Sequence, residues 1–257
     1  MQTKDQLGRE VDFPEDPKRI VSLVPSQTEL LVDLGLTDKL VGVTKFCVHP
    51  EDIRKEKTVV GGTKQVHYDK IAALQPDIII ANKEENTEEM VTELEKIAPV
   101  WVSDIYTVED SLDFIEAMGE LFHKKTASRD LIEAITNSRS DFLSTIQDRK
   151  PLQVAYLIWK KPYMVCGRWT FINALLEENR FENIIKDPRS RYPEVDQEEL
   201  KTADLILLSS EPYPFKEADR QQLEIQLNKS VMLVDGEYFS WYGSRLAKAY
   251  DYFKRLL

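Results

Sequence analysis

Two stretches of this chain repeat one local pattern, and this repeat constrains the fold more than any other feature. In each, a short helical segment leads through an aspartate, Asp77 or Asp204, into an uninterrupted apolar run at residues 78–80 or 205–208. Short apolar runs without polar alternation are typical of parallel strands that are buried on both faces. The two aspartates lie 127 positions apart in a chain of 257 residues. The sequence therefore predicts two α/β lobes, with a small-molecule site in the cleft between them.

Each half also opens with the same order of elements. In the first half, residues 19–24 read as a strand, and Ser26 with Glu29 matches a capping box that begins a helix ending at Gly35. In the second half, residues 152–158 read as a strand and residues 170–178 as a helix. A repeated order of strand, helix and strand favours parallel sheets built from βαβ units.

A long helical tract lies between the halves. Residues 128–149 carry apolar side chains at the helical period, and neither glycine nor proline interrupts residues 124–150. A helical crossover predicts a stiff connection. We therefore expect an α/β fold of two Rossmann-like lobes with mainly parallel sheets, joined by a single long α-helix. The predicted boundaries are an N-terminal lobe over residues 1–125, a connecting helix over 126–149 and a C-terminal lobe over 150–257.

Composition narrows the class of protein. The net charge of −11 argues against nucleic acid as a partner, because phosphates require a basic surface. No apolar run approaches the roughly 18 residues that span a bilayer. The first ten residues contain no apolar stretch of the secretory type. We expect a periplasmic or membrane-associated protein if a signal sequence was removed, and a cytoplasmic one if Met1 is the native start. Cys47 and Cys166 are too few for a disulfide framework and should be free thiols.

Several short elements, taken in order and spacing, point to one family. They lie at residues 18–29, 61–63, 74–80, 181–184, 210–215 and 241–245. Together they resemble the helical-backbone (class III) substrate-binding proteins of ABC transporters, which serve cobalamin, haem and ferric siderophores. The resemblance covers nearly the whole chain, and residues 178–187 look most like the cobalamin-binding branch.

The resemblance implies a function and its partners. The chain would be the substrate-binding component of an ABC importer and not an enzyme. It would act as a monomer that captures a small-molecule metal chelate (a corrinoid, haem or ferric siderophore) and delivers it to an ABC permease dimer. The family also implies one exposed glutamate on each lobe that docks on the permease. Glu88 matches the first of these positions, and we assign Glu217 to the second because both follow the repeated strand.

The ligand should contact loops at the carboxyl ends of the strands. Aromatic residues concentrate in these loops, and flat aromatic walls suit a planar or macrocyclic ligand. One departure is that Asn82 stands where the cobalamin-binding relatives place a tryptophan. The expected ligand-binding residues are Ser26, Gln27, Phe46, Cys47, His49 and Asn82 in the first half, and Trp159, Cys166, Arg168, Trp169, Tyr213, Phe239 and Trp241 in the second.

Direct metal ligation is one way in which these loops could hold a chelate. Cys47, His49 and Cys166 could converge on a metal or on the axial position of a tetrapyrrole. The alternative is that both cysteines are buried small apolar residues. Arginines offer another contact, since Arg168, Arg189 and Arg191 could pair with carboxylates or phosphate of an anionic chelate or form ordinary surface ion pairs.

Enzyme motifs are missing from the sequence, including GxGxxG, Walker A, GxSxG and HExxH. We therefore expect no catalytic cofactor. The rival enzyme hypothesis is a class II tetrapyrrole chelatase, in which His49 with Glu84 or Glu237 would carry the metal and accept protons. A third hypothesis is a cytoplasmic carrier or sensor of the same kind of ligand, which would work without a permease.

Overall fold

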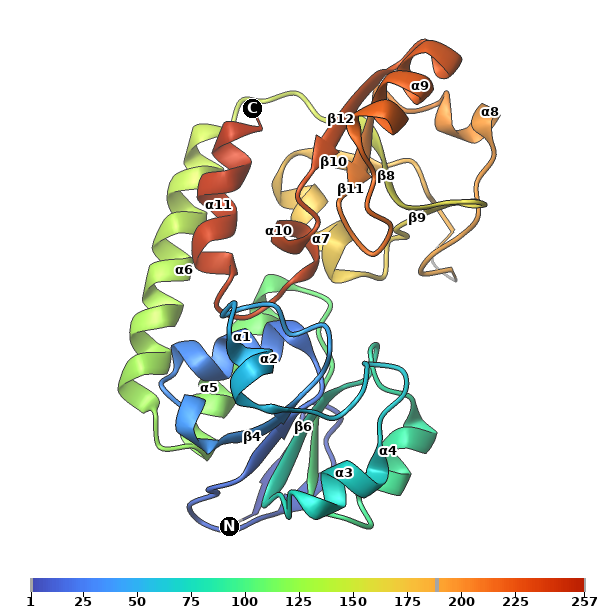
Figure 1. The fold of residues 1–257 in the computed structure, drawn as a ribbon. Coiled ribbons are helices and arrows are strands. Elements are labelled where there is room, and N and C mark those ends of the chain that lie inside the picture. The colour runs from blue at the N-terminus through green and yellow to red at the C-terminus, as the bar shows by residue number, and fades with distance from the viewer. Residues whose placement is uncertain (1, 188–189, 257) are drawn as a thin grey trace. The chain divides into compact units, whose positions relative to one another are not determined.

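The computed structural model describes residues 2–187 and 190–256, and the chain forms two compact units (Figure 1). Unit 1 comprises Met1–Ile105, Glu109–Ile135 and Tyr242–Ala247. Unit 2 comprises Tyr106–Val108, Thr136–Trp241 and Lys248–Leu257. A short segment near the C-terminus, Tyr242–Ala247, therefore belongs with the N-terminal unit and lies apart from the rest of the predicted lobe over residues 150–257.

Unit 1 is built on a five-stranded parallel sheet with the order β5-β4-β3-β6-β7. Strand β6, which lies between β3 and β7, is buried at every position, and this explains its uninterrupted apolar sequence. A two-stranded antiparallel hairpin, β1 with β2, precedes the sheet. The strands are β1 (Gln2–Lys4), β2 (Glu10–Asp12), β3 (Ile20–Ser22), β4 (Leu40–Val43), β5 (Thr58–Val59), β6 (Ile78–Asn82) and β7 (Val100–Ser103).

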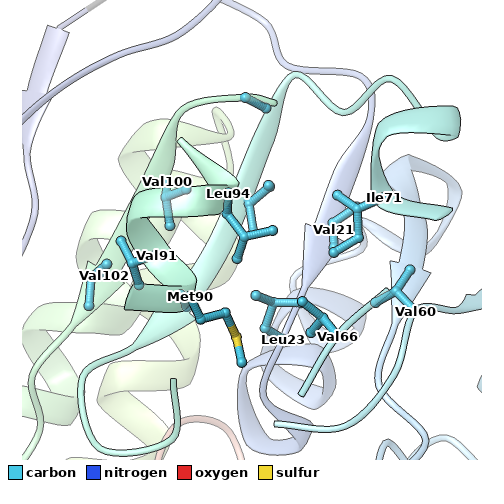
Figure 2. Packing of buried hydrophobic residues seen from close by; sticks show 13 residues of the cluster. Val21, Leu23, Val60, Val66, Ile71, Met90, Val91, Leu94, Val100 and Val102 are labelled. Atoms are coloured by element: carbon cyan, nitrogen blue, oxygen red, sulfur yellow. The ribbon is translucent and has the colours of Figure 1, made fainter. Parts of the chain in front are cut away.

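Helices α3 (Tyr68–Ala73) and α4 (Glu88–Leu94) contribute to the apolar core on one face of this sheet. Their buried side chains, such as Ile71 and Leu94, pack with alternate residues of β3, β6 and β7 (Figure 2). Alternation places every second strand residue on the same face, so one set of side chains fills this core. The remaining short helices of the first half are α1 (Pro25–Asp33), the 3-10 helix η1 (Thr37–Lys39) and α2 (Ile53–Glu56).

Unit 2 repeats the arrangement. Its parallel strands have the order β10-β8-β11-β12, and β9 pairs antiparallel with β8. The two runs that the sequence repeats, β6 and β11, occupy equivalent places in the two sheets. The strands are β8 (Leu152–Lys160), β9 (Tyr163–Val165), β10 (Phe181–Asn183), β11 (Leu205–Ser209) and β12 (Ser230–Val234).

The helices of unit 2 complete the repeat. Helix α8 (Gln197–Leu200) precedes β11 as α3 precedes β6, and α9 (Glu217–Leu227) follows β11 as α4 follows β6. Both contribute to a core with β8, β11 and β12, for example through Leu200 and Leu223. Helix α7 (Phe171–Glu178) begins at the predicted place, because the Thr170 hydroxyl accepts a hydrogen bond from the Asn173 N–H and caps it.

The predicted connecting helix is present as α6 (Lys125–Thr145), which follows α5 (Val108–Leu121). It ends at Thr145 and not at Arg149, where a tight turn bonds the Arg149 N–H to the Ile146 carbonyl. Its Phe142 ring contacts Tyr250 and Phe253 of α11 (Leu246–Arg255) at centroid distances of 5.8 and 5.9 Å. The short helix α10 (Glu237–Ser240) precedes α11.

The capping box predicted at Ser26 and Glu29 is wrong. Helix α1 begins at Pro25, Val24 is its N-cap residue, and no side chain caps it. Proline fits the first helical position because its fixed φ is already helical and it has no N–H to satisfy there. Glu29 is instead bonded to Arg245. The predicted stop at Gly35 is confirmed, since this residue has a φ of +73° just after the helix.

Within the described part of the chain, none of the helices is both long and apolar enough to cross a lipid bilayer.

Candidate functional site

The expected ligand-binding residues of unit 1 come together at one edge of its sheet. All five strands are parallel, so the loops after β3, β4 and β6 leave the sheet at the same edge. Ser26 and Gln27 follow β3, the segment from Phe46 to His49 follows β4, and Asn82 ends β6. Their side chains nevertheless differ widely in exposure.

The side chain of Gln27 is buried inside unit 1 and contacts three separate segments of the chain. Its amide Nε2 lies 3.1 Å from the Ala81 carbonyl, 2.8 Å from the Ser103 hydroxyl and 3.1 Å from the Tyr242 hydroxyl. Burial raises the pKa of the Tyr242 phenol, so this hydroxyl stays protonated. Gln27 thus connects β6, β7 and the C-terminal segment that carries Tyr242. The neighbouring residue Ser26 is also buried.

Asn82 is also buried, with 2% of its surface exposed. Its side-chain oxygen accepts hydrogen bonds from the backbone N–H groups of Glu84 and Glu85 at 2.9 and 3.1 Å. Its amide Nδ2 donates to the Ser103 hydroxyl at 2.9 Å. Asn86 continues the network, because its amide donates to the Thr63 carbonyl at 2.7 Å. Asn82 therefore fixes the shape of the loop after β6, which explains why a small amide stands here.

The loop after β4 exposes one aromatic ring and encloses one thiol. Phe46 is 49% exposed, and the Lys45 ammonium lies 5.0 Å from its ring centre. Cys47 is fully buried, and its sulfur lies 3.1 and 3.3 Å from the hydroxyls of Thr28 and Thr44. Burial raises the pKa of this thiol. His49 is half-buried.

In unit 2 the hairpin of β8 and β9 carries an aromatic row. Trp159 is 41% exposed and meets Tyr213 edge to face at a centroid distance of 5.6 Å. Tyr213 in turn packs against Phe215 at 4.7 Å. Tyr213 and Phe215 belong to the loop between β11 and α9, so the row joins the carboxyl end of β8 to this loop.

The loop between β9 and α7, like the loop after β4, carries both an exposed aromatic residue and a buried cysteine. Arg168 and Trp169 are exposed, Trp169 at 57%. Cys166 is fully buried, and burial raises the pKa of its thiol to about 12. The Asn183 amide donates to the Cys166 carbonyl at 2.9 Å and holds this loop against β10.

The last two expected residues lie deeper. Phe239 is fully buried and packs against Tyr156 and Phe253 at centroid distances of 5.2 and 4.8 Å, so it belongs to the aromatic core. Trp241 is 7% exposed, and its indole N–H donates to the Glu211 carboxylate at 3.0 Å. The Ser240 hydroxyl donates to the same oxygen. Burial raises the pKa of Glu211, against the effect of these hydrogen bonds.

The proposed metal ligands do not form a metal site in the described residues, where no group of three His, Cys, Asp or Glu side chains could hold an ion. Metals bind the thiolate form of cysteine. Both thiols are enclosed in their own units, and burial raises the pKa of each. These surroundings give ligation by Cys47, His49 and Cys166 no support. Arg189 lies outside the described residues.

The two glutamates predicted to dock on a permease occupy equivalent places. Glu88 is the first residue of α4 and Glu217 the first residue of α9, and both are exposed. An acidic residue in the first turn also stabilises a helix through its dipole. Glu217 forms an ion pair with Arg220 at 2.7 Å, and this neighbour lowers the pKa of the glutamate.

Sequence reasoning missed three residues at these edges. Glu211 holds Trp241, Tyr106 packs against Trp169, and Ser103 joins Gln27 to Asn82. A polar residue at or just after the end of an apolar strand was the available signal for Glu211 and Ser103, since Ser103 is the last residue of β7 and Glu211 is the second residue after β11. Tyr106 gave no comparable signal, because its partner lies 63 positions away in the sequence.

Comparison with known proteins agrees with this architecture. An uncharacterized ABC transporter substrate-binding lipoprotein, YvrC, of Bacillus subtilis (strain 168) is 28% identical over 193 residues, which cover 71% of this chain. The vitamin B12-binding protein of Pectobacterium carotovorum subsp. carotovorum (strain PC1) is 26% identical over 245 residues, covering 91% of this chain and 86% of that protein. The matched region spans 60% of the length of the Bacillus lipoprotein.

A solved structure, that of a periplasmic heme binding protein from Pseudomonas aeruginosa, superimposes with a TM-score of 0.79 at 20% identity. The match covers 93% of this chain and 92% of that one, and it shows a common fold. The model of the periplasmic binding protein family matches residues 20–228, which include strands and edge loops of both units. The resemblance found in the sequence is thereby confirmed, and this chain belongs to the periplasmic binding protein family.

Proposed function

We propose that this chain is the solute-binding component of an ABC importer, and that it captures a bulky metal chelate such as a corrinoid, haem or ferric siderophore. One observation carries the ligand class. Among the described residues, six large apolar side chains are exposed. Three of them are aromatic residues at or near strand ends: Phe46 in the loop after β4, Trp159 close to the carboxyl end of β8, and Trp169 in the loop after β9. An exposed ring costs hydrophobic free energy that a planar ligand could recover.

The family and the named relatives support the same proposal. The Pectobacterium relative binds vitamin B12 and the Pseudomonas structure is that of a heme binding protein, so similar chains take large metal chelates. We place this chain outside the cytoplasm, as a monomer that docks on a permease through Glu88 and Glu217. Binding and release, without chemical change of the ligand, would be its activity.

In this proposal, the exposed aromatic residues contact the ligand, and buried polar residues hold the loops of unit 1 in shape. The candidate ligand contacts are Phe46 and His49 within unit 1, and Trp159, Trp169 and Tyr213 within unit 2. Gln27 and Asn82 would hold the loops of unit 1 in shape from below. Cys47, Cys166 and Phe239 are left out of the contact set because their side chains are enclosed.

A fluorescence titration tests the proposal. Trp159 and Trp169 are exposed, so a bound chelate that absorbs near their emission should quench them. We expect saturable quenching at one chelate per chain with aquocobalamin, hemin or a ferric hydroxamate, after correction for absorption with free N-acetyltryptophanamide. The Trp169→Ala variant should lose part of the signal. Linear, non-saturating quenching by all three chelates would refute the proposal.

A further inference from the structure

A groove of about 430 Å³ lies in unit 1 between strand β2 and the segment that joins α4 to β7. We call it the strand-edge groove. It is lined by residues 9–12 of the hairpin, by Glu95 and by residues 97–100. Val100 is the first residue of β7, so the groove lies at the amino edge of the parallel sheet. The candidate ligand contacts of unit 1 lie at the carboxyl edge.

Arg9 fixes one wall of the groove. Its Nη2 donates to the Val100 carbonyl at 3.0 Å, and its Nη1 donates to the Glu95 carboxylate at 2.7 Å. Its Nε donates to the Asp5 carboxylate at 2.8 Å. Arg9 thereby ties the hairpin of β1 and β2 to the end of α4 and to β7. Because its guanidinium already bonds two carboxylates, Arg9 adds little positive charge to the groove.

The backbone of β2 is unpaired along the edge that faces away from β1. Within the described part of the chain, β2 pairs with β1 alone, and β1 contributes no residue to the groove lining. The Asp5 N–H donates to the Arg9 carbonyl at 3.0 Å, and bonded and non-bonded positions alternate along an antiparallel pair. The register therefore directs the backbone N–H and carbonyl groups of Glu10 and Asp12 away from β1.

The side chains of the groove are apolar where they are buried and mostly acidic where they are exposed. Val11, Ala98 and Val100 are buried. Apart from Arg9, the charged lining residues are Glu10, Asp12 and Glu95, and all three are exposed. Lys4, the register partner of Glu10, lies on β1 and does not line the groove.

This charge distribution selects the kind of partner. A second copy of the chain that paired along the same edge would bring its own Glu10 and Asp12 against these carboxylates, and like charges across a strand pair are destabilising. A basic segment would instead be attracted to the groove. In an extended segment, successive side chains point to opposite faces, so apolar and basic residues can face different walls.

We infer that the strand-edge groove binds a basic extended segment of a partner protein, which pairs with β2 as an added strand. Its backbone would bond the outward groups of Glu10 and Asp12, and its lysine or arginine side chains would meet the carboxylates. Main-chain bonds supply affinity in this mode of recognition, and the side chains supply selection. The inference goes beyond the proposed function, because the groove and the ligand contacts of unit 1 lie at opposite edges of the sheet.

Short peptides with blocked ends test the inference, with binding followed by nuclear magnetic resonance of isotope-labelled protein. The probe alternates lysine and valine. One control peptide carries glutamate in place of lysine. Another keeps the lysines but has N-methyl groups on every second backbone nitrogen, in either of the two registers, so that it retains its charge and loses strand pairing.

Two double variants separate the charge of the groove from the charge of the whole protein. Glu10→Gln with Asp12→Asn removes two carboxylates from the groove and keeps the backbone of β2. Asp130→Asn with Glu133→Gln is the matched control, because both residues are exposed on α6 within unit 1.

We expect saturable shift changes from the lysine–valine peptide, centred on residues 9–12 and 97–100, and none from the glutamate peptide. Binding should weaken by about tenfold or more in one N-methylated register and in the groove variant, and should be unchanged in the control variant. Equal binding of all the lysine peptides, or shifts spread over the acidic surface, would show charge attraction alone and overturn the inference.

The absence of any saturable shift change would overturn it as well. A concentration-dependent dimer with shift changes at residues 9–12 would assign the groove to a second copy of the chain and likewise overturn it. None of these results bears on chelate binding, so the proposed function is tested separately.

Discussion

Arg245 forms a bidentate ion pair with Glu29 inside unit 1, with its Nε and one terminal nitrogen 2.9 and 2.8 Å from the two carboxylate oxygens. The two residues are 216 positions apart in the chain. Both are nearly buried, and burial raises the pKa of Glu29 although the arginine opposes this. The pair fastens the C-terminal segment Tyr242–Ala247 to helix α1. The hydrogen bond from the Gly243 N–H to the Ser111 hydroxyl, 2.9 Å long, fastens it a second time.

Replacing Arg245 alone should lower the stability of the protein far more than replacing both Glu29 and Arg245. Arg245→Met leaves the Glu29 carboxylate buried without its partner, so we expect the free energy of unfolding to fall by about 3–5 kcal/mol in urea. The double variant Glu29→Leu with Arg245→Met should recover most of this loss. Lys55→Ala, which breaks the exposed pair with Asp52, is the control and should change stability by about 0.5 kcal/mol or less. A similarly small effect of Arg245→Met would contradict the anchoring role.

Asn82 should behave as a structural residue. Asn82→Ala removes the acceptor of the Glu84 and Glu85 N–H groups and one of the donors to the Ser103 hydroxyl, so we expect a loss of about 1–3 kcal/mol in thermal or urea unfolding. Asn137→Ala, at an exposed position of α6, is the matched control and should be neutral. Unchanged stability of Asn82→Ala together with weaker ligand binding would instead make this residue a direct contact.

Glu211 should make stability depend on pH. Its pKa in the folded protein lies above the ordinary value of 4.5 because the carboxyl is buried, with Glu237 and Asp235 adding repulsion. The folded state therefore binds this proton more tightly than the unfolded state does. The resulting stabilisation is fully present below about pH 4.5 and is lost as the pH rises through the folded pKa.

Glu211→Gln removes this titration and keeps an oxygen that can accept from Ser240 and Trp241. The melting temperature of the variant, relative to wild type, should therefore rise between pH 5 and pH 8. Glu198→Gln, at an exposed position paired with Lys201, is the control and should give parallel curves. Parallel curves for Glu211→Gln as well would show that the carboxyl titrates alike in both states.

The two tryptophans at the edge of unit 2 should separate binding from stability. Trp169 is exposed, so Trp169→Ala should weaken chelate binding by about 1–3 kcal/mol with little change in melting temperature. Trp241 is buried and bonded to Glu211, so Trp241→Ala should cost about 3 kcal/mol or more of stability. An unchanged dissociation constant in Trp169→Ala would remove this ring from the ligand site.

The docking glutamates should affect transport and leave ligand binding intact. Both are exposed at helix starts, so the double variant Glu88→Ala with Glu217→Ala should fold normally and keep its dissociation constant for the chelate. Chelate uptake into proteoliposomes that contain the cognate permease and ATPase should fall at least tenfold. Glu133→Ala, an exposed position on α6, is the control and should transport normally. Loss of chelate affinity in the double variant would refute a pure docking role.

The sequence was sufficient to predict the sheets because buried parallel strands have a continuous apolar pattern. Strands β6 and β11 were found this way, and their equivalent places in the two sheets confirm the repeat. The start of α7 was predictable because its cap is local. The Thr170 hydroxyl accepts a hydrogen bond from the N–H of Asn173, three residues further along the chain.

Features that depend on distant partners were not predictable. Ser26 and Glu29 match a capping box in the local sequence. In the structure, however, the Glu29 carboxylate accepts hydrogen bonds from Arg245 and not from the backbone at the start of the helix. Asn82 and Cys47 lie at the expected edge of the sheet, yet their side chains turn inward, that of Asn82 to the Glu84 N–H and that of Cys47 to the Thr28 hydroxyl of α1. Position along a loop can be read from sequence, whereas the direction of a side chain depends on the packing around it.

Native mass spectrometry of the purified protein with an equimolar mixture of aquocobalamin, hemin and ferric hydroxamate tests the central claim most directly. Each chelate has a distinct mass, so one spectrum reports both whether a ligand binds and which one. The account predicts a complex of one chain with one chelate that persists at micromolar concentration and is weakened by Trp169→Ala. A spectrum that contains only the free chain at tenfold excess of every chelate would contradict it.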